Sequence, residues 1–190
     1  HNFRNLLTVV IMGKKNLFLI LFLCSAVALL TYYFIYSKDK VFNPNDRELN
    51  IGSSSLFDEV RLEKGSDSLV LQKGKEGWRI NGEYFVKSEK FRQLENMVKN
   101  LDVLHRVEKM KVENTVKELK SNGIRLEVFN EGKLVLKYTV GQDIEDSSGV
   151  HVLKEGALTP YVAYLLGEQF LFNELLKVDE DSWRSLVLFD

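Results

Sequence analysis

"GIRLEVFNEGKLVLKYTVG", residues 123–141, is the stretch that decides the fold. Apolar and polar residues alternate on both sides of Asn-Glu-Gly-Lys, residues 130–133. Such alternation is typical of half-buried strands, and a short glycine-containing segment between two alternating runs predicts a β-hairpin. We therefore expect two antiparallel strands that share one buried face.

Two helices are expected before this hairpin. After Ser88, a plausible N-cap, the period becomes helical, with apolar residues at Phe91, Leu94, Met97, Val98, Leu101 and Leu104. A shorter helix is predicted from Asn114, its cap, to Gly123, expected as a left-handed stop. An amphipathic stripe beside a sheet is typical of core, although a helix that binds a partner has the same pattern.

Further short strands flank these elements. Alternation in residues 60–86, interrupted by glycine turns, predicts a meander of about three strands, and residues 150–165 predict another hairpin around Gly156 to Pro160. A helix, an acidic turn and a last strand at residues 185–190 complete the pattern. The predicted class is α+β, a mainly antiparallel sheet with helices packed on one face, occupying residues 56–190.

The segment before this domain has a different composition. Residues 39–55 contain "FNPND" and "GSSS" and predict a linker, and residues 14–38 predict a transmembrane helix after a tail of residues 1–13. Met12 is the expected true start, with His1–Ile11 upstream of it. The apolar end of the chain is typical of a strand whose partner follows, so we expect a truncated domain.

Leu17 to Tyr36 contains no charged residue and, at ~1.5 Å per residue, covers about 30 Å, the thickness of a bilayer's hydrocarbon core. Lysines bracket this run, and three tyrosines gather at its C-terminal end. A cleaved signal peptide ending at Ala26-Val27-Ala28 is the first alternative, but hydrophobicity continues to Tyr36. A lipoprotein modified at Cys24 is the second, but Leu23 precedes that cysteine where a small residue is required.

Charges on the two flanks of the run are nearly tied, so the positive-inside rule does not decide the orientation. Since a long C-terminal part can cross a membrane largely regardless of its charge, we expect a cytoplasmic N-terminus and a globular domain on the far side of the membrane. Lys and Arg number 26 against 27 Asp and Glu, which disfavours nucleic-acid binding. The single cysteine allows no internal disulfide.

Few residues point to chemistry. His105 is expected at a helix-to-strand junction and His151 on a strand, neither in a nucleophile motif or at metal-ligand spacing, and His1 lies in the tail. The acidic segments at residues 142–149 and 179–182 do not fit an EF-hand and predict solvated loops. Trp78 and Trp183 are expected in the core, with Arg184 pairing with the acidic turn before it. The sequence predicts no catalytic, cofactor-binding or metal-binding residue, and no enzyme.

Several pieces together resemble a known family. The apolar run, "FDEVRLEKGSDSLVLQKGKEGWRING", "VLHRVEKM", residues 123–141, "PYVAYLLG" and "DSWRSLVLF" are similar to the domain of unknown function 4340 (DUF4340) in its Bacteroidetes form. The similarity covers roughly Leu56 to Asp190, most specifically Trp78, Gly141 and Trp183-Arg184-Ser185, and departs at Leu166–Phe170. It implies a membrane-anchored protein without an assigned reaction, related to auxiliary components of ABC-type transport systems.

The leading hypothesis is a single-pass membrane protein whose periplasmic domain binds or scaffolds an envelope component such as an ABC transporter subunit. The alternative is an envelope enzyme or a solute-binding protein that acts on a small ligand. A pocket lined by His105 or His151 with convergent carboxylates would favour the alternative, whereas a packed sheet with an exposed apolar edge or patch would favour the scaffold.

Overall fold

The computed structural model describes residues 18–32, 44–144, 149–167 and 171–185. The chain divides into two compact units, His1–Phe42 and Asn43–Asp190, which are treated separately below. In the first unit, residues 18–32 form a helix whose side chains are exposed on every side except at Ala26, which is partly buried. None of the helices in the described ranges is both long and apolar enough to cross a membrane. Residues 14–17 and 33–38 of the predicted span lie outside the described residues.

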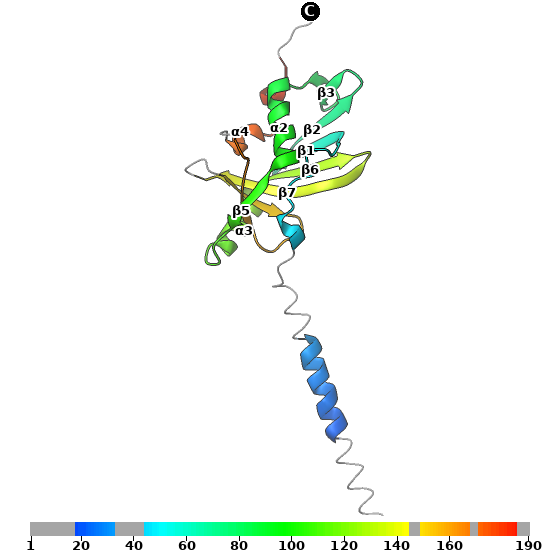
Figure 1. The fold of residues 1–190 in the computed structure, drawn as a ribbon, viewed down its shortest axis with the longest axis vertical. Coiled ribbons are helices and arrows are strands. Elements are labelled where there is room, and N and C mark those ends of the chain that lie inside the picture. The colour runs from blue at the N-terminus through cyan, green and yellow to red at the C-terminus, as the bar shows by residue number, and fades with distance from the viewer. Residues whose placement is uncertain (1–17, 33–43, 145–148, 168–170, 186–190) are drawn as a thin grey trace, which may run out of the picture. The chain divides into compact units, whose positions relative to one another are not determined.

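The second unit is an α+β domain with one nine-stranded antiparallel sheet, as predicted for the class (Figure 1). The strand order is β4-β3-β2-β1-β6-β7-β8-β9-β5. The strands are β1 (Glu59–Lys64), β2 (Asp67–Gly74), β3 (Gly77–Ile80), β4 (Tyr84–Phe85), β5 (Asp102–Arg106), β6 (Ile124–Asn130), β7 (Lys133–Asp143), β8 (Val150–Lys154) and β9 (Tyr161–Tyr164). The helices are η1 (Pro44–Arg47), α2 (Ser88–Asn100), α3 (Val112–Asn122), α4 (Phe172–Leu175) and α5 (Glu180–Trp183).

The hairpin predicted from residues 123–141 is confirmed as β6 and β7. Asn130 pairs with Lys133, and the turn residues between them, Glu131 and Gly132, have φ of 51° and 73°. Positive φ at both central positions gives the turn the twist that suits a two-residue hairpin loop. The hairpins β1–β2, β2–β3 and β8–β9 are likewise found where the sequence predicts them.

One face of the sheet carries the main core. Alternate residues of β6 and β7, including Leu126, Val128, Tyr138 and Val140, are buried against Leu94, Met97 and Val98 of α2, which lies across the strands (Figure 1). Trp183 is fully buried in this core, and Trp78 is partly buried with its ring centroid 4.3 Å from that of Phe91. The predicted core positions of both tryptophans are therefore confirmed.

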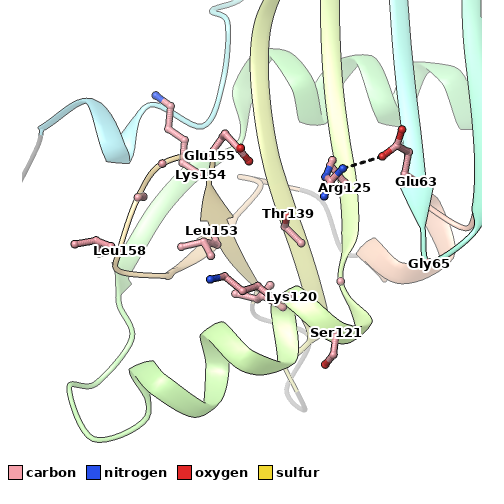
Figure 2. Close-up of a pocket in the computed structure, with 14 residues that line it drawn as sticks. Glu63, Gly65, Lys120, Ser121, Arg125, Thr139, Leu153, Lys154, Glu155 and Leu158 are labelled. Atoms are coloured by element: carbon pink, nitrogen blue, oxygen red, sulfur yellow. Dashed lines mark hydrogen bonds and ion pairs between the residues drawn. The ribbon is translucent and has the colours of Figure 1, made fainter. Parts of the chain in front are cut away.

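The expectation that all helices pack on one face is wrong. A Cβ added at Gly141 would meet Leu119 of α3 at 2.8 Å, and one at Gly123 would meet Thr139 at 2.4 Å. Thr139 and Gly141 alternate with the core residues Tyr138 and Val140 along β7, so α3 covers the opposite face (Figure 2).

Three further expectations need correction. The first predicted helix ends at Asn100 instead of continuing to Leu104, because Asp102–Arg106 pairs with β9 as an edge strand with a bulge around Leu104. Gly123 ends α3 with φ of −69°, so it is not left-handed. Residues after 170 form two single-turn helices, α4 and α5, in place of one longer helix.

Candidate functional site: a groove between α3 and the β8–β9 loop

A hollow with a volume of about 610 Å³ lies on the α3 face of the sheet in the second unit. This volume is within the range of about 300–1,000 Å³ that is usual for ligand-binding clefts. Its residues come from the β1–β2 turn, the C-terminal end of α3, strands β6 and β7, and the loop that joins β8 to β9 (Figure 2).

The floor of the groove is a single row of residues across four strands. Glu63 of β1 is paired in register with Arg125 of β6, Arg125 with Thr139 of β7, and Thr139 with Leu153 of β8. Cross-strand partners share one face of a sheet, so the four side chains line up side by side. The row changes from charged at Glu63 to apolar at Leu153.

Two walls border this floor. The last turn of α3 supplies Leu119, Lys120 and Ser121 on one side, and the β8–β9 loop supplies Gly156, Ala157 and Leu158 on the other. The helix can approach β7 closely because Gly123 and Gly141 have no side chain at the contact. Leu158 exposes 60% of its surface.

Several charged side chains around the groove form ion pairs. Arg125 Nη1 lies 3.0 Å from Glu63 Oε2, and Lys137 Nζ lies 3.1 Å from Glu127 and 3.8 Å from Glu155. Lys154 donates a hydrogen bond to the backbone carbonyl of Asn45. Within the described residues neither Lys120 nor Lys154 has an ion-pair partner, and in Figure 2 the amine of Lys120 points toward the Leu158 end of the groove.

The two histidines of the domain lie outside the groove. His105 on β5 and His151 on β8 are both paired with Val162 of β9, so the two histidines lie on either side of Val162 on the α3 face of the sheet. Burial lowers the pKa of His151; the carboxylate of Glu118 opposes this, and the positive charges of His105 and Lys111 add to it. In the described ranges no three His, Cys, Asp or Glu residues are grouped so that they could hold a metal ion.

The acidic segments have structural contacts that the sequence did not predict. Asp143, at the end of β7, accepts backbone N–H bonds from Phe172 (2.7 Å) and Asn173 (3.1 Å), and a side-chain bond from Asn173 (2.8 Å). It therefore caps α4 from a distant strand, while residues 145–148 of the same loop lie outside the described residues.

The second acidic segment forms α5, which is held against the start of α2. Lys90 Nζ lies 3.0 Å from Ser182 Oγ and 4.4 Å from the centre of the Trp183 ring. The guanidinium of Arg184 stacks on Tyr84 at 3.9 Å, in place of the predicted pairing with the acidic turn, which Arg184 contacts through its backbone N–H at Glu180. Arg184 also forms a bridge with Val86, which brings the chain to the edge of the sheet beside β4.

No protein-family model matches this chain, and no curated protein or solved structure matches it significantly. The similarity to DUF4340 stays a prediction from the residues quoted above.

Proposed function

We propose that this chain is a single-pass membrane protein whose N-terminal apolar segment anchors an α+β domain on the periplasmic side of the inner membrane. The domain binds another component of the envelope, and the similarity to DUF4340 makes a subunit of an ABC-type transport system the favoured partner.

The observation that carries this proposal is the exposure of the helix at residues 18–32. Phe18, Leu21, Phe22 and Leu29 expose 76, 61, 70 and 68% of their surfaces, and apolar side chains point outward around the whole helix. Each such side chain gains about 1.5–3 kcal/mol when it leaves water. A helix that is apolar on all sides is typical of a membrane environment, and the uncharged run extends in sequence from Leu17 to Tyr36.

Two features of the second unit support binding over catalysis. A pocket lined by His105 or His151 would favour an envelope enzyme, but neither histidine lines the groove described above. Exposed leucines occur at the groove and at the bulged edge strand, where Leu158 and Leu104 expose 60 and 48%. The exposed side chain of Leu158 offers apolar surface to a partner at the mouth of a preformed hollow.

The anchor is tested by extracting bacterial membranes that contain the full chain with alkaline carbonate and sequencing its mature N-terminus. We expect the protein to stay in the membrane pellet with residues 17–36 intact. Since an arginine at the centre of a membrane helix costs about 2.5–3.5 kcal/mol, Leu21→Arg combined with Leu29→Arg should release the chain from the pellet. Leu21→Ile combined with Leu29→Ile is the matched control and should remain there. An N-terminus beyond Ala28 together with a soluble wild-type protein would refute the proposal.

A further inference from the structure

The groove described above has two chemically different halves. Glu63 and Arg125 form an ion pair at one end of the floor, whereas Leu153 and the exposed Leu158 lie at the other. Lys120 reaches over the apolar half, and no counter-ion for it occurs in the described part of the chain (Figure 2). Lys154 also lines the groove without an ion pair in the described residues, although its ammonium donates to the carbonyl of Asn45. An apolar surface beside an ammonium that has no counter-ion is complementary to a ligand that carries a carboxylate next to an apolar group.

The dimensions of the floor indicate how long that ligand is. Directly paired residues of neighbouring antiparallel strands are about 5 Å apart, so the row from Glu63 to Leu153 spans about 15 Å. An extended polypeptide advances about 3.3 Å per residue, so the floor accommodates four or five residues. A long-chain fatty acid fits less well, because the end of its tail would have to lie along the ion-paired half of the floor.

Thr139 lies at the centre of the row, and its methyl group faces Gly123 at the end of α3. Its hydroxyl has no hydrogen bond recorded within the described residues, so it is available to a backbone carbonyl or amide of a ligand. The groove is also formed before any ligand binds, because the close contacts of Gly123 and Gly141 hold α3 against β7. A preformed site does not incur the entropic cost of ordering its walls when it binds.

From these features we propose that the groove binds an extended acidic segment of a partner protein, with an Asp or Glu side chain at Lys120 and a neighbouring apolar side chain between Leu153 and Leu158. This inference rests on the proposed binding function and identifies its surface and the chemistry of its partner.

The test uses the full chain in detergent and short peptides that carry a neutral dye, with binding measured by fluorescence anisotropy. The central pair of residues is Asp-Leu or Leu-Asp in the probes and Asn-Leu or Lys-Leu in the comparison peptides. We expect the wild-type protein to bind an acidic probe more tightly than the Asn-Leu and Lys-Leu peptides. Lys120→Glu should weaken binding of the acidic probe by about tenfold or more and improve binding of the Lys-Leu peptide, because the charge of the site is reversed.

Lys117→Glu is the matched control, since Lys117 is exposed on the same helix but does not line the groove. It makes the same change in net charge and should leave the affinity for the acidic probe close to that of the wild type. Leu158→Asp should weaken binding, whereas Leu166→Asp, at a more exposed leucine outside the groove, should not.

Three results would overturn the inference: equal binding of acidic and neutral peptides, equal losses in the Lys117 and Lys120 variants, or displacement of the probe by free octanoate at the probe's own affinity. The last result would assign the groove to small amphipathic acids. Failure of peptide binding in a chain that resists carbonate extraction would reject the groove and leave the membrane anchor intact. Loss of the chain from the membrane with peptide binding retained would reject the anchor alone.

Discussion

The hydroxyl of Tyr138 is buried in the core of the sheet and has no hydrogen-bond partner among the described residues. Burial without a partner also raises the pKa of this phenol. An unsatisfied buried hydroxyl costs about 1–3 kcal/mol, so removing the oxygen while keeping the ring should not destabilise the protein.

Tyr138→Phe should therefore leave the free energy of unfolding unchanged or raise it by about 1 kcal/mol. Urea denaturation of the wild type and the variant at neutral pH measures this change. Tyr138→Leu, which also removes ring volume, is the control and should destabilise the domain by about 1–3 kcal/mol. A clear loss of stability in Tyr138→Phe would indicate that the hydroxyl does have a partner in solution.

Lys90 links the stability of the domain to pH. Burial, followed by the charge of Lys87, lowers the pKa of the Lys90 ammonium to about 8 from its usual 10.5. Between these two values the unfolded chain keeps the proton that the folded chain has lost, so stability rises as pH increases from 8 toward 10. Urea denaturation across this range should show the rise in the wild type and a smaller one in Lys90→Met. An identical rise in both proteins would contradict this role for Lys90.

Predictions for single residues succeeded where a residue's environment depends on its own strand or helix. Alternation placed His151 on a strand and Trp183 in the core, as found. Gly123 was misinterpreted, because glycine after a helix usually provides a left-handed stop. Glycine is required at residue 123 because a Cβ there would collide with Thr139 of β7. This contact joins two separate elements, so the local sequence does not show it.

At the scale of elements, α4 depends on a residue far away in the chain. Asp143 supplies both carboxylate oxygens to the first N–H groups of this four-residue helix. A helix of one turn has little stability of its own, so an external cap contributes much of what holds it.

Asp143→Ala should lower the free energy of unfolding by about 1–2 kcal/mol, and Asp143→Asn, which keeps one acceptor oxygen, should lower it less. Asp67→Ala, at an exposed aspartate on β2, serves as the control with little expected change. Chemical denaturation followed by tryptophan fluorescence measures all three variants. If the Asp143 and Asp67 variants had equal stability, the cap would have no energetic importance.

The close packing of α3 on β7 leads to a prediction about stability. A Cβ at residue 123 would lie 2.4 Å from the carbonyl oxygen of Leu119 and 3.1 Å from that of Val140, and backbone atoms cannot move aside easily. Gly123→Ala should destabilise the domain by about 1–3 kcal/mol, whereas Ser121→Ala on the exposed side of the same turn should change stability little. Thermal or urea denaturation of both variants measures the difference, and similar stabilities would contradict the close contact.

The periodicity of apolar residues predicted which helices and strands form. It did not predict where each element ends or which face of the sheet each helix covers. Leu101 and Leu104 continue the helical spacing of α2, although the chain leaves the helix at Leu101 and pairs with β9. That pairing depends on β9, which lies far along the chain, so local periodicity could not detect it. The groove was not predicted for the same reason, because its floor is formed by residues of four strands. Within the hairpin, only the polar positions Arg125 and Thr139 indicated a second face of the sheet.

For the whole molecule, the single cysteine provides a reporter of membrane insertion. Cys24 lies in the helix of residues 18–32 with an exposed side chain. If this helix lies in lipid, a membrane-impermeant maleimide should fail to label Cys24 in intact membranes but should label it after denaturation in detergent. Cys24→Ala combined with Ser53→Cys moves the thiol to an exposed residue near the start of the second unit and should react before denaturation from the periplasmic side. Rapid labelling of Cys24 in intact membranes would contradict the anchor.

The strand order shows why the class of the fold was easier to predict than its assembly. Strands β1 to β4 form one local meander and β6 to β9 another, and both were visible as alternating runs separated by turns. Only the register between β1 and β6, in which Glu63 meets Arg125, joins these meanders into a single sheet.

This junction has a consequence for biosynthesis. When the chain emerges from its N-terminus, β1 is complete long before β6 appears, so the edge that β1 will offer to β6 stays unpaired while roughly sixty further residues are made. An unpaired strand edge is a template for aggregation, and closing so long a loop is slow. Folding of this domain should therefore depend on a holdase, or on slow delivery of the chain, until Ile124–Asn130 becomes available.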